Sequence, residues 1–279
     1  MLLTTGCSIV YGAELDEDDW FSEEHWEETF SHKLAQHLNI DYTCTAGCGN
    51  SNRKIFRDLI RWFSDGTIPY HSNNQKTNIT NCTHMVVLWT QWFREEIFAK
   101  KCGKIENASD DAPVYSDMGF LQYTRDARNI GSVLSSKDLK IHKEYWENYL
   151  IDGQKHLTEL VTFMTTIQLL CENYGIKLVQ GTTLRDFSYH WSRIVSESKE
   201  CEFTKQYCSK MRDMMGNLHK TSKIGMTKNT YSCIMTKKFL GEKWIKMLKC
   251  GHPNAEVHTE YAEYLYNIFQ ENFPEGEKK

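Results

Sequence analysis

Short apolar runs that alternate with amphipathic segments constrain the fold of this chain more than any other feature. The runs that read as strands are Leu2–Thr5, Ile40–Cys44, His84–Trp89 and Ile176–Gln180. The third run is compact and apolar, which is typical of a strand buried on both faces of a sheet. Strands that alternate with helices predict a parallel sheet with helices on both sides, so we expect an α/β fold.

Apolar residues that recur every three or four positions predict helices between these strands. The predicted helices cover about 22–39, a segment that begins at Ser51 or Asn52, about 142–173, and a last segment after Pro253. Ser51 and Asn52 are both favoured N-cap residues, so either can start the second helix. Gly175 follows the third helix and is expected to end it.

The chain of 279 residues is long enough for one large domain. The alternation of strands and helices is broken at 99–140, which is polar and irregular, and at 186–245, which shows no clean pattern. No internal repeat and no low-complexity tract divides the chain. We therefore expect a single domain over 1–279 with insertions at 99–140 and 186–245.

Composition argues against several classes of function. The formal net charge of −4 does not favour nucleic-acid binding. No apolar run reaches the roughly 18 residues of a membrane span, and the N-terminus lacks the basic region of an export signal. The ten cysteines are scattered without a Cys-x-x-Cys pair. We expect free thiols in a reducing cytoplasm, with neither a metal nor another cofactor.

Polar residues with catalytic chemistry follow the predicted strands. Ser8 comes after the first strand, a glycine loop around Gly49 after the second, and Gln91 after the third, while His252 precedes the last helix. Open α/β sheets carry their sites at the carboxyl ends of strands. A serine can attack an acyl group, a histidine can take its proton, and backbone N–H groups with an amide can hold the oxyanion. The pattern favours acyl transfer.

Four motifs in this order resemble the SGNH (GDSL-like) hydrolases, especially a divergent branch encoded by marine tailed phages. The motifs are Gly6-Cys7-Ser8-Ile9-Val10-Tyr11-Gly12, Ala46-x-x-Gly49-x-Ser51-Asn52-x-x-Ile55, Trp89-Thr90-x-x-x-Arg94-x-Glu96 and Gly251-His252-Pro253-x-x-x-x-His258-x-x-x-Ala262. They extend from one end of the chain to the other. The resemblance implies a three-layer α/β/α fold with a parallel, flavodoxin-like central sheet.

The resemblance also implies roles for single residues. Ser8 matches the nucleophile, and its backbone N–H and that of Gly49 match the oxyanion donors. The third motif usually reads Gly-x-Asn, so here either Gln91 or Thr90 supplies the third donor or that donor is missing. His252 matches the general base. Asn52 and Arg94 are expected to bind substrate, Arg94 through an anionic group, whereas His258 is expected to have a packing or surface role.

One departure from the family concerns the catalytic acid. The family places an aspartate two or three residues before the histidine, where this chain has Cys250 and Lys249. We therefore expect a Ser8–His252 dyad that cleaves a carboxylic ester, an acetyl group on a carbohydrate being one candidate. The expected partners are a small ester or glycan substrate, with virion or homo-oligomer contacts as a further option.

Two alternatives to an esterase are left open by the sequence. The first is a catalytically degenerate protein that keeps the SGNH fold as a phage virion component or binding module, which the missing aspartate favours. In that case the protein would be virion-associated or in the host cytoplasm. The second is a nucleotide- or phosphate-binding α/β protein that uses the Gly49 loop. This loop lacks the Gly-Lys-Ser/Thr ending of a P-loop.

Overall fold

The structure of the chain is a computed structural model. It describes residues 1–12, 15, 23–47, 50–66, 81–90, 95–98, 120–123, 144, 153–182, 206, 210, 225–226 and 253–274. Most of both predicted insertions, 99–140 and 186–245, lies outside these residues, so the division of the chain into one domain with two insertions stays a prediction.

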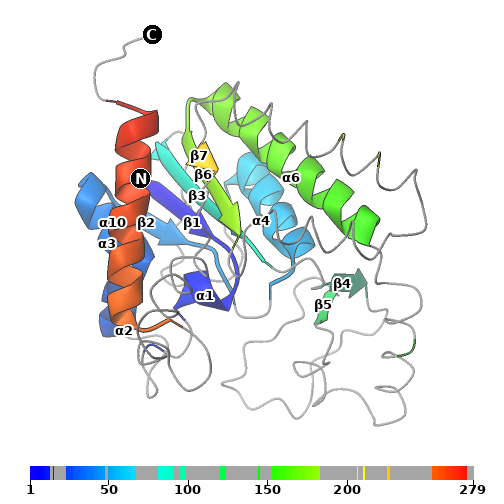
Figure 1. The fold of residues 1–279 in the computed structure, drawn as a ribbon, viewed down its shortest axis with the longest axis horizontal. Coiled ribbons are helices and arrows are strands. Elements are labelled where there is room, and N and C mark those ends of the chain that lie inside the picture. Colours follow the sequence, from blue (N-terminus) through cyan, green and yellow to red (C-terminus); the bar gives the residue numbers. More distant parts are fainter. Residues whose placement is uncertain are drawn as a thin grey trace.

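A parallel sheet forms the centre of the fold (Figure 1). Its strands are β1 (Leu2–Thr5), β2 (Tyr42–Cys44), β3 (His84–Trp89), β6 (Lys177–Thr182) and β7 (Gly225–Met226). They lie in the order β2-β1-β3-β6-β7, and every neighbouring pair is parallel. Counted in chain order within this sheet, the arrangement is 2-1-3-4-5, the flavodoxin-like order. The predicted fold class is therefore confirmed.

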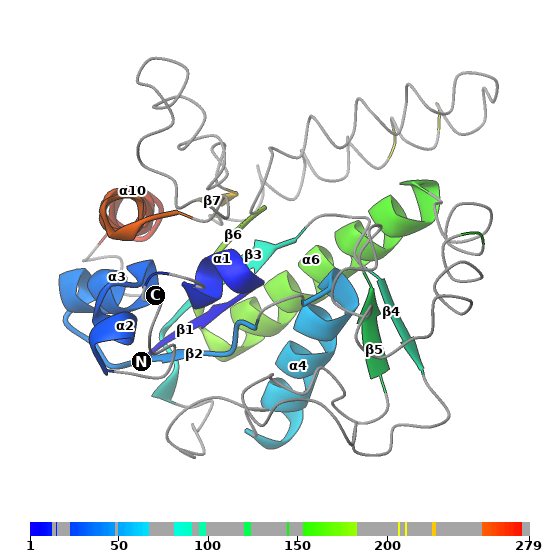
Figure 2. The same ribbon diagram turned by 90° about the horizontal axis from the view of Figure 1, so that it is seen from below.

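Helices cover both faces of the sheet (Figures 1 and 2). Helices α3 (Phe30–Leu38) and α10 (Ala255–Asn272) lie against one face, and α4 (Asn52–Asp65) and α6 (Gly153–Tyr174) lie against the other. Side chains alternate between the faces along each strand. In β1, Leu2 packs into the α3–α10 core and Leu3 into the α4–α6 core. Three layers result.

The predicted helix over 22–39 is wrong in one respect, because two helices occupy this segment. Helix α2 (Glu23–Glu27) ends before Thr29, and α3 begins after it. The Thr29 hydroxyl accepts a hydrogen bond from the His32 N–H and donates one to the Trp26 carbonyl oxygen. A threonine that bonds to the backbone in this way competes with a continuous helix and caps the next one.

The other predicted helix ends agree with the structure where it describes them. Ser51, not Asn52, caps α4 by accepting a hydrogen bond from the Lys54 N–H. Gly175 ends α6 with a φ of 68°, a conformation that favours glycine. Asn254 caps α10, which begins two residues after Pro253. Strand β6 continues to Thr182, two residues beyond the predicted run.

A second, small sheet consists of β4 (Glu95–Phe98) and β5 (Phe120–Tyr123), which pair in antiparallel register. It lies apart from the central sheet (Figure 1). Among the described residues, no helix combines the length and the apolar character that crossing a membrane requires.

Candidate active site

The candidate site lies at the carboxyl ends of β1 and β3, which are neighbours in the sheet. From β1 the chain goes to β2 on one side, whereas β3 leads on to β6 on the other. The strand order therefore reverses between β1 and β3, and doubly wound sheets bind their ligands at such a switch point. Ser8 follows β1 and Thr90 follows β3, so the fold brings the first and third sequence motifs to one place.

A tight turn carries the chain from β1 to Ser8. Ser8 is the first residue of α1 (Ser8–Tyr11) and is 8% exposed. A Cβ atom at Gly6 would lie 2.3 Å from Val10 Cγ2 and 2.9 Å from the Leu88 carbonyl oxygen. These distances leave no room for a side chain, so the close approach of the turn to β3 requires glycine.

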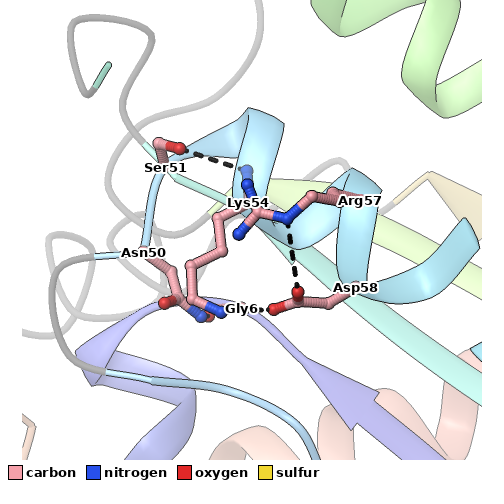
Figure 3. A network of polar contacts seen from close by, with 6 residues as sticks. All are labelled: Gly6, Asn50, Ser51, Lys54, Arg57 and Asp58. Carbon is pink, nitrogen blue, oxygen red and sulfur yellow. Dashed lines mark hydrogen bonds and ion pairs between the residues drawn. The ribbon is translucent and has the colours of Figure 1, made fainter. Parts of the chain in front are cut away.

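Three consecutive residues after β2 each make a different connection at this edge of the sheet, and Figure 3 shows the first two, Asn50 and Ser51. Asn50 donates from Nδ2 to the Gly6 carbonyl oxygen at 2.9 Å. Ser51 caps α4. Asn52 donates from Nδ2 to the Thr90 carbonyl oxygen at 3.2 Å and accepts from the Thr90 N–H through Oδ1 at 2.8 Å. The second motif thus links the turn after β1, helix α4 and the end of β3.

Asn52 was expected to bind substrate, and its side-chain amide already makes hydrogen bonds within the protein. The side chain is 8% exposed, and its amide oxygen and nitrogen both bond to the backbone of Thr90. Sequence reasoning missed this contact and the one between Asn50 and Gly6. The available signal was the pair of asparagines on either side of the cap residue, because an asparagine can donate and accept at once.

The hydroxyl group of Thr90 makes no hydrogen bond to the residues that the structure describes. The residue is 2% exposed, and within the described part of the chain its hydroxyl oxygen has no hydrogen-bond partner. The hydroxyl of Thr5, the last residue of β1, is fully buried and is also without a partner there. A buried polar group without a partner costs about 1–3 kcal/mol, so such groups call for a physical explanation.

A buried group of charges lies on the first turns of α4 (Figure 3). Lys54 Nζ lies 2.6 Å from Asp58 Oδ2, and Arg57 Nε lies 4.0 Å from Asp58 Oδ1. The Asp58 side chain is only 4% exposed. A buried carboxylate that pairs with two cations fixes the side chains around it. We therefore assign these residues to the scaffold of α4.

Other predicted site residues lie outside the described part of the chain. These are Gly49, Gln91, Arg94 and His252, and their roles stay predictions. The helix that follows His252 is described, and it packs on α3. His258 of α10 is fully buried, accepts a hydrogen bond from the Phe30 N–H through Nδ1 at 3.1 Å, and stacks on the Phe30 ring. The packing role predicted for His258 is confirmed.

The cysteines with described positions, Cys7, Cys44, Cys82 and Cys171, are buried, and the last three of them are free thiols. Burial raises the pKa of Cys44, and it raises the pKa of Cys82 to about 11. Such thiols are poor nucleophiles at neutral pH because little thiolate forms. Among the described residues, no three His, Cys, Asp or Glu side chains gather as a metal site.

No protein-family model matches this chain, and no curated protein does. Similar solved structures include the acetyl xylan esterase Est2A from Butyrivibrio proteoclasticus, with 12% identity and a TM-score of 0.47 over 97% of this chain and 63% of that one. A family two carbohydrate esterase from Cellvibrio japonicus has 11% identity and a TM-score of 0.47 over 97% and 60%. A G-D-S-L family protein from Desulfitobacterium hafniense DCB-2 has 8% identity and a TM-score of 0.43 over 96% and 98%.

This chain spans less than two thirds of the length of the two carbohydrate esterases. These likenesses are distant, so the function proposed below rests on the residues of this chain.

Proposed function

We propose that this chain is an SGNH-type serine hydrolase that cleaves a carboxylic ester through Ser8 and His252. One observation supports this most strongly: Ser8 and Thr90 follow neighbouring strands at the switch point of the sheet, where ligands bind in this class of fold. His252 is included because it belongs to the fourth motif, and it precedes α10 in the sequence.

In the proposed mechanism, Ser8 Oγ attacks the ester carbonyl carbon while His252 takes the hydroxyl proton. The negative charge of the tetrahedral intermediate is held by the Ser8 and Gly49 N–H groups and by the Thr90 hydroxyl. The intermediate collapses to an acyl-enzyme, and the alcohol leaves with the proton from His252. Water then attacks the acyl-enzyme with His252 again as the base, which releases the acid and restores Ser8.

Thr90 is proposed as the third oxyanion donor because its buried hydroxyl lacks a partner among the described residues, so it can donate to a substrate oxygen without losing another bond. Gln91 is the other candidate from the sequence. Arg94 is proposed to contact an anionic part of the substrate. We place the reaction in a reducing cytoplasm, as the scattered cysteines suggest.

A catalytically degenerate SGNH-fold protein is the second candidate. Lys249 and Cys250 stand where the family has an aspartate, and this departure favours it. Loss of the group that orients the histidine lowers turnover by about 10⁴-fold in the best-studied serine triad. A slow enzyme and a binding protein therefore have to be separated by experiment.

The test is covalent labelling with a fluorophosphonate, together with the hydrolysis of p-nitrophenyl acetate. We expect one adduct on Ser8 of the parent protein, none on Ser8→Ala, and a loss of at least about 10³-fold in turnover in that variant. Ser64→Ala is the matched control, since Ser64 is exposed and bonds only its own helix in the described contacts. No adduct, with turnover equal to that of Ser8→Ala, would leave the degenerate protein as the function.

A further inference from the structure

We infer that Asn52 is a positioning residue that fixes Thr90, and that with Asn50 it holds the ends of β1 and β3 on one support. This inference deepens the proposed function and rests on it for the catalytic effect. The starting point is that Asn52 makes both of its described hydrogen bonds to a single residue 38 positions away in the chain.

The support itself is rigid. Asn52 is the first residue of α4, directly after the Ser51 cap. The helix is anchored in the α4–α6 core by Ile55, Leu59 and Trp62, each no more than 1% exposed. A group placed at the capped start of a well-packed helix has little freedom to move, which is what a precise site requires.

The two bonds of Asn52 fix more than the distance to β3. The planar amide accepts from the Thr90 N–H and donates to the Thr90 carbonyl, so it restrains the backbone on both sides of the Thr90 Cα. Both backbone polar groups of Thr90 are then engaged, and the side-chain hydroxyl is the group that remains. Asn52 thereby selects the hydroxyl of Thr90, and not its N–H, as the donor to an oxyanion.

Asn50 makes the corresponding connection to the other strand. It is 3% exposed and donates to the Gly6 carbonyl oxygen, two residues before Ser8. The nucleophile turn and Thr90 are thus attached through two asparagines that flank one cap residue. These hydrogen bonds restrain the backbone of the nucleophile turn and the backbone of Thr90 relative to the same helix.

This role differs from substrate binding in what it predicts for kinetics. A residue that binds substrate raises KM when it is changed. A residue that positions an oxyanion donor lowers kcat and leaves KM nearly unchanged, since the donor acts in the transition state. Asn52→Asp tests the difference with little change in volume: it keeps an acceptor for the Thr90 N–H and replaces the donor by an oxygen that repels the Thr90 carbonyl.

We expect Asn52→Asp to lower kcat for p-nitrophenyl acetate by about 10- to 100-fold, with KM changed less than about twofold. Arg53→Ala is the matched control. It removes the ion pair between the neighbouring Arg53 and Glu159 of α6, and so loosens α4 without touching Thr90. This control is expected to stay within about threefold of the parent kcat. Unchanged kcat in Asn52→Asp, or a raised KM alone, would overturn the inference.

Amide hydrogen exchange at Thr90 gives a readout that does not need turnover. Asn52→Ala removes the acceptor, so Thr90 N–H exchange should be faster by at least about tenfold while exchange at the centre of β3 stays slow. Equal exchange would refute the positioning role. If the parent protein neither labels at Ser8 nor hydrolyses ester, the proposed function fails, whereas this measurement still decides whether Asn52 holds Thr90. Should Asn52→Ala not fold, the Asn52→Asp kinetics and labelling rate decide.

Discussion

The two edges of the central sheet are held in different ways. At the amino edge the backbone bonds to backbone: the Thr83 N–H donates to the Met1 carbonyl at 3.0 Å, and the Lys177 N–H donates to the Thr83 carbonyl at 2.9 Å. At the carboxyl edge, side chains of Asn50 and Asn52 add bonds to backbone groups. Thr83 Oγ1 also donates to the Met1 carbonyl oxygen, at 3.5 Å, but a backbone bond already joins these two residues. Residue identity at single positions therefore matters more at the edge where we place the chemistry.

The edges also differ in the polar groups that they bury. The carboxyl edge holds the hydroxyls of Thr5 and Thr90 without partners in the described structure. The amino edge holds His84, whose pKa is lowered to about 4, first by burial and then by the charges of Lys177 and the N-terminal amino group. At the amino edge the cost in stability appears only when acid protonates His84, whereas the two buried hydroxyls of the carboxyl edge carry theirs at every pH, and the Thr90 hydroxyl has a chemical use in our proposal.

In the comparison of the two edges, the largest expected effect comes from Thr90→Val, which removes the hydroxyl and keeps the shape. We predict a loss of about 100-fold in kcat/KM for ester hydrolysis, as for other oxyanion donors. Stability should stay the same or rise slightly, because a buried hydroxyl without a partner is removed. Chemical denaturation and initial rates measure the two effects separately.

Thr5→Val is the matched control for this prediction, because Thr5 is also a buried threonine whose hydroxyl has no partner in the described structure. It should show the same small change in stability and keep the parent activity within about twofold. Equal activity in Thr90→Val and Thr5→Val would remove the functional distinction between these two hydroxyls.

A smaller effect is expected at the amino edge, where His84 makes stability depend on pH. The pKa of His84 is about 4 in the folded protein and 6.5 in its ordinary state. The unfolded chain therefore takes up the proton first as pH falls, so stability is full above about pH 6.5 and is lost toward pH 4. We expect a loss of roughly 1–2 kcal/mol, a discounted figure because the ring is partly exposed to solvent.

Urea unfolding of the parent protein and of His84→Gln at pH 7 and pH 5 measures this contribution, the variant being expected to lose less stability between the two. Lys177→Gln removes one of the charges that lower the pKa of His84. The pKa of His84 in the folded protein should then rise toward 6.5, and the pH range over which stability is lost should become narrower. If the parent and His84→Gln lose the same stability over this range, the histidine is not responsible.

The smallest effects concern two helix ends. Ser51→Ala removes the cap of α4 and should cost about 1 kcal/mol. Asn39, at the C-terminal end of α3, has a φ of 52° and is exposed. Asn39→Gly should stabilise the protein by about 0.5 kcal/mol, because glycine adopts this conformation without strain. Thermal unfolding measures both changes in stability. A loss of stability in Asn39→Gly would contradict the claim that the positive φ of Asn39 strains the C-terminal end of α3.

The sequence was sufficient for most of the fold. The run His84–Trp89 is β3 without any change of bounds, because a strand buried on both faces is apolar throughout. The break at Thr29 was missed, since Trp26, Phe30 and Leu34 keep one helical spacing across it and local hydrogen bonding ends α2. The spacing of apolar residues indicates which face of a helix is buried, but it does not indicate where a side chain makes a hydrogen bond to the backbone.

The candidate site was predictable in part. Motif order and strand ends place Ser8 and Thr90 at one edge, and the structure agrees. The bond between Asn52 and Thr90 joins residues far apart in sequence, so the local pair of asparagines indicates a polar contact but not its partner. The roles of His252, Gly49, Gln91 and Arg94, and the resemblance to a phage branch, stay predictions.

The packing of α10 on α3 has a consequence for the order in which the protein can be completed. Among the described residues, the core beneath α3 needs Tyr261, Leu265 and Phe269 of α10, whereas the core beneath α4 is filled by residues up to Leu178. During synthesis on the ribosome, the α4 side of the sheet can therefore pack before α10 is made, while Phe30 and Leu34 still face solvent. A hydrolase of the proposed kind would stay inert until α10 leaves the exit tunnel.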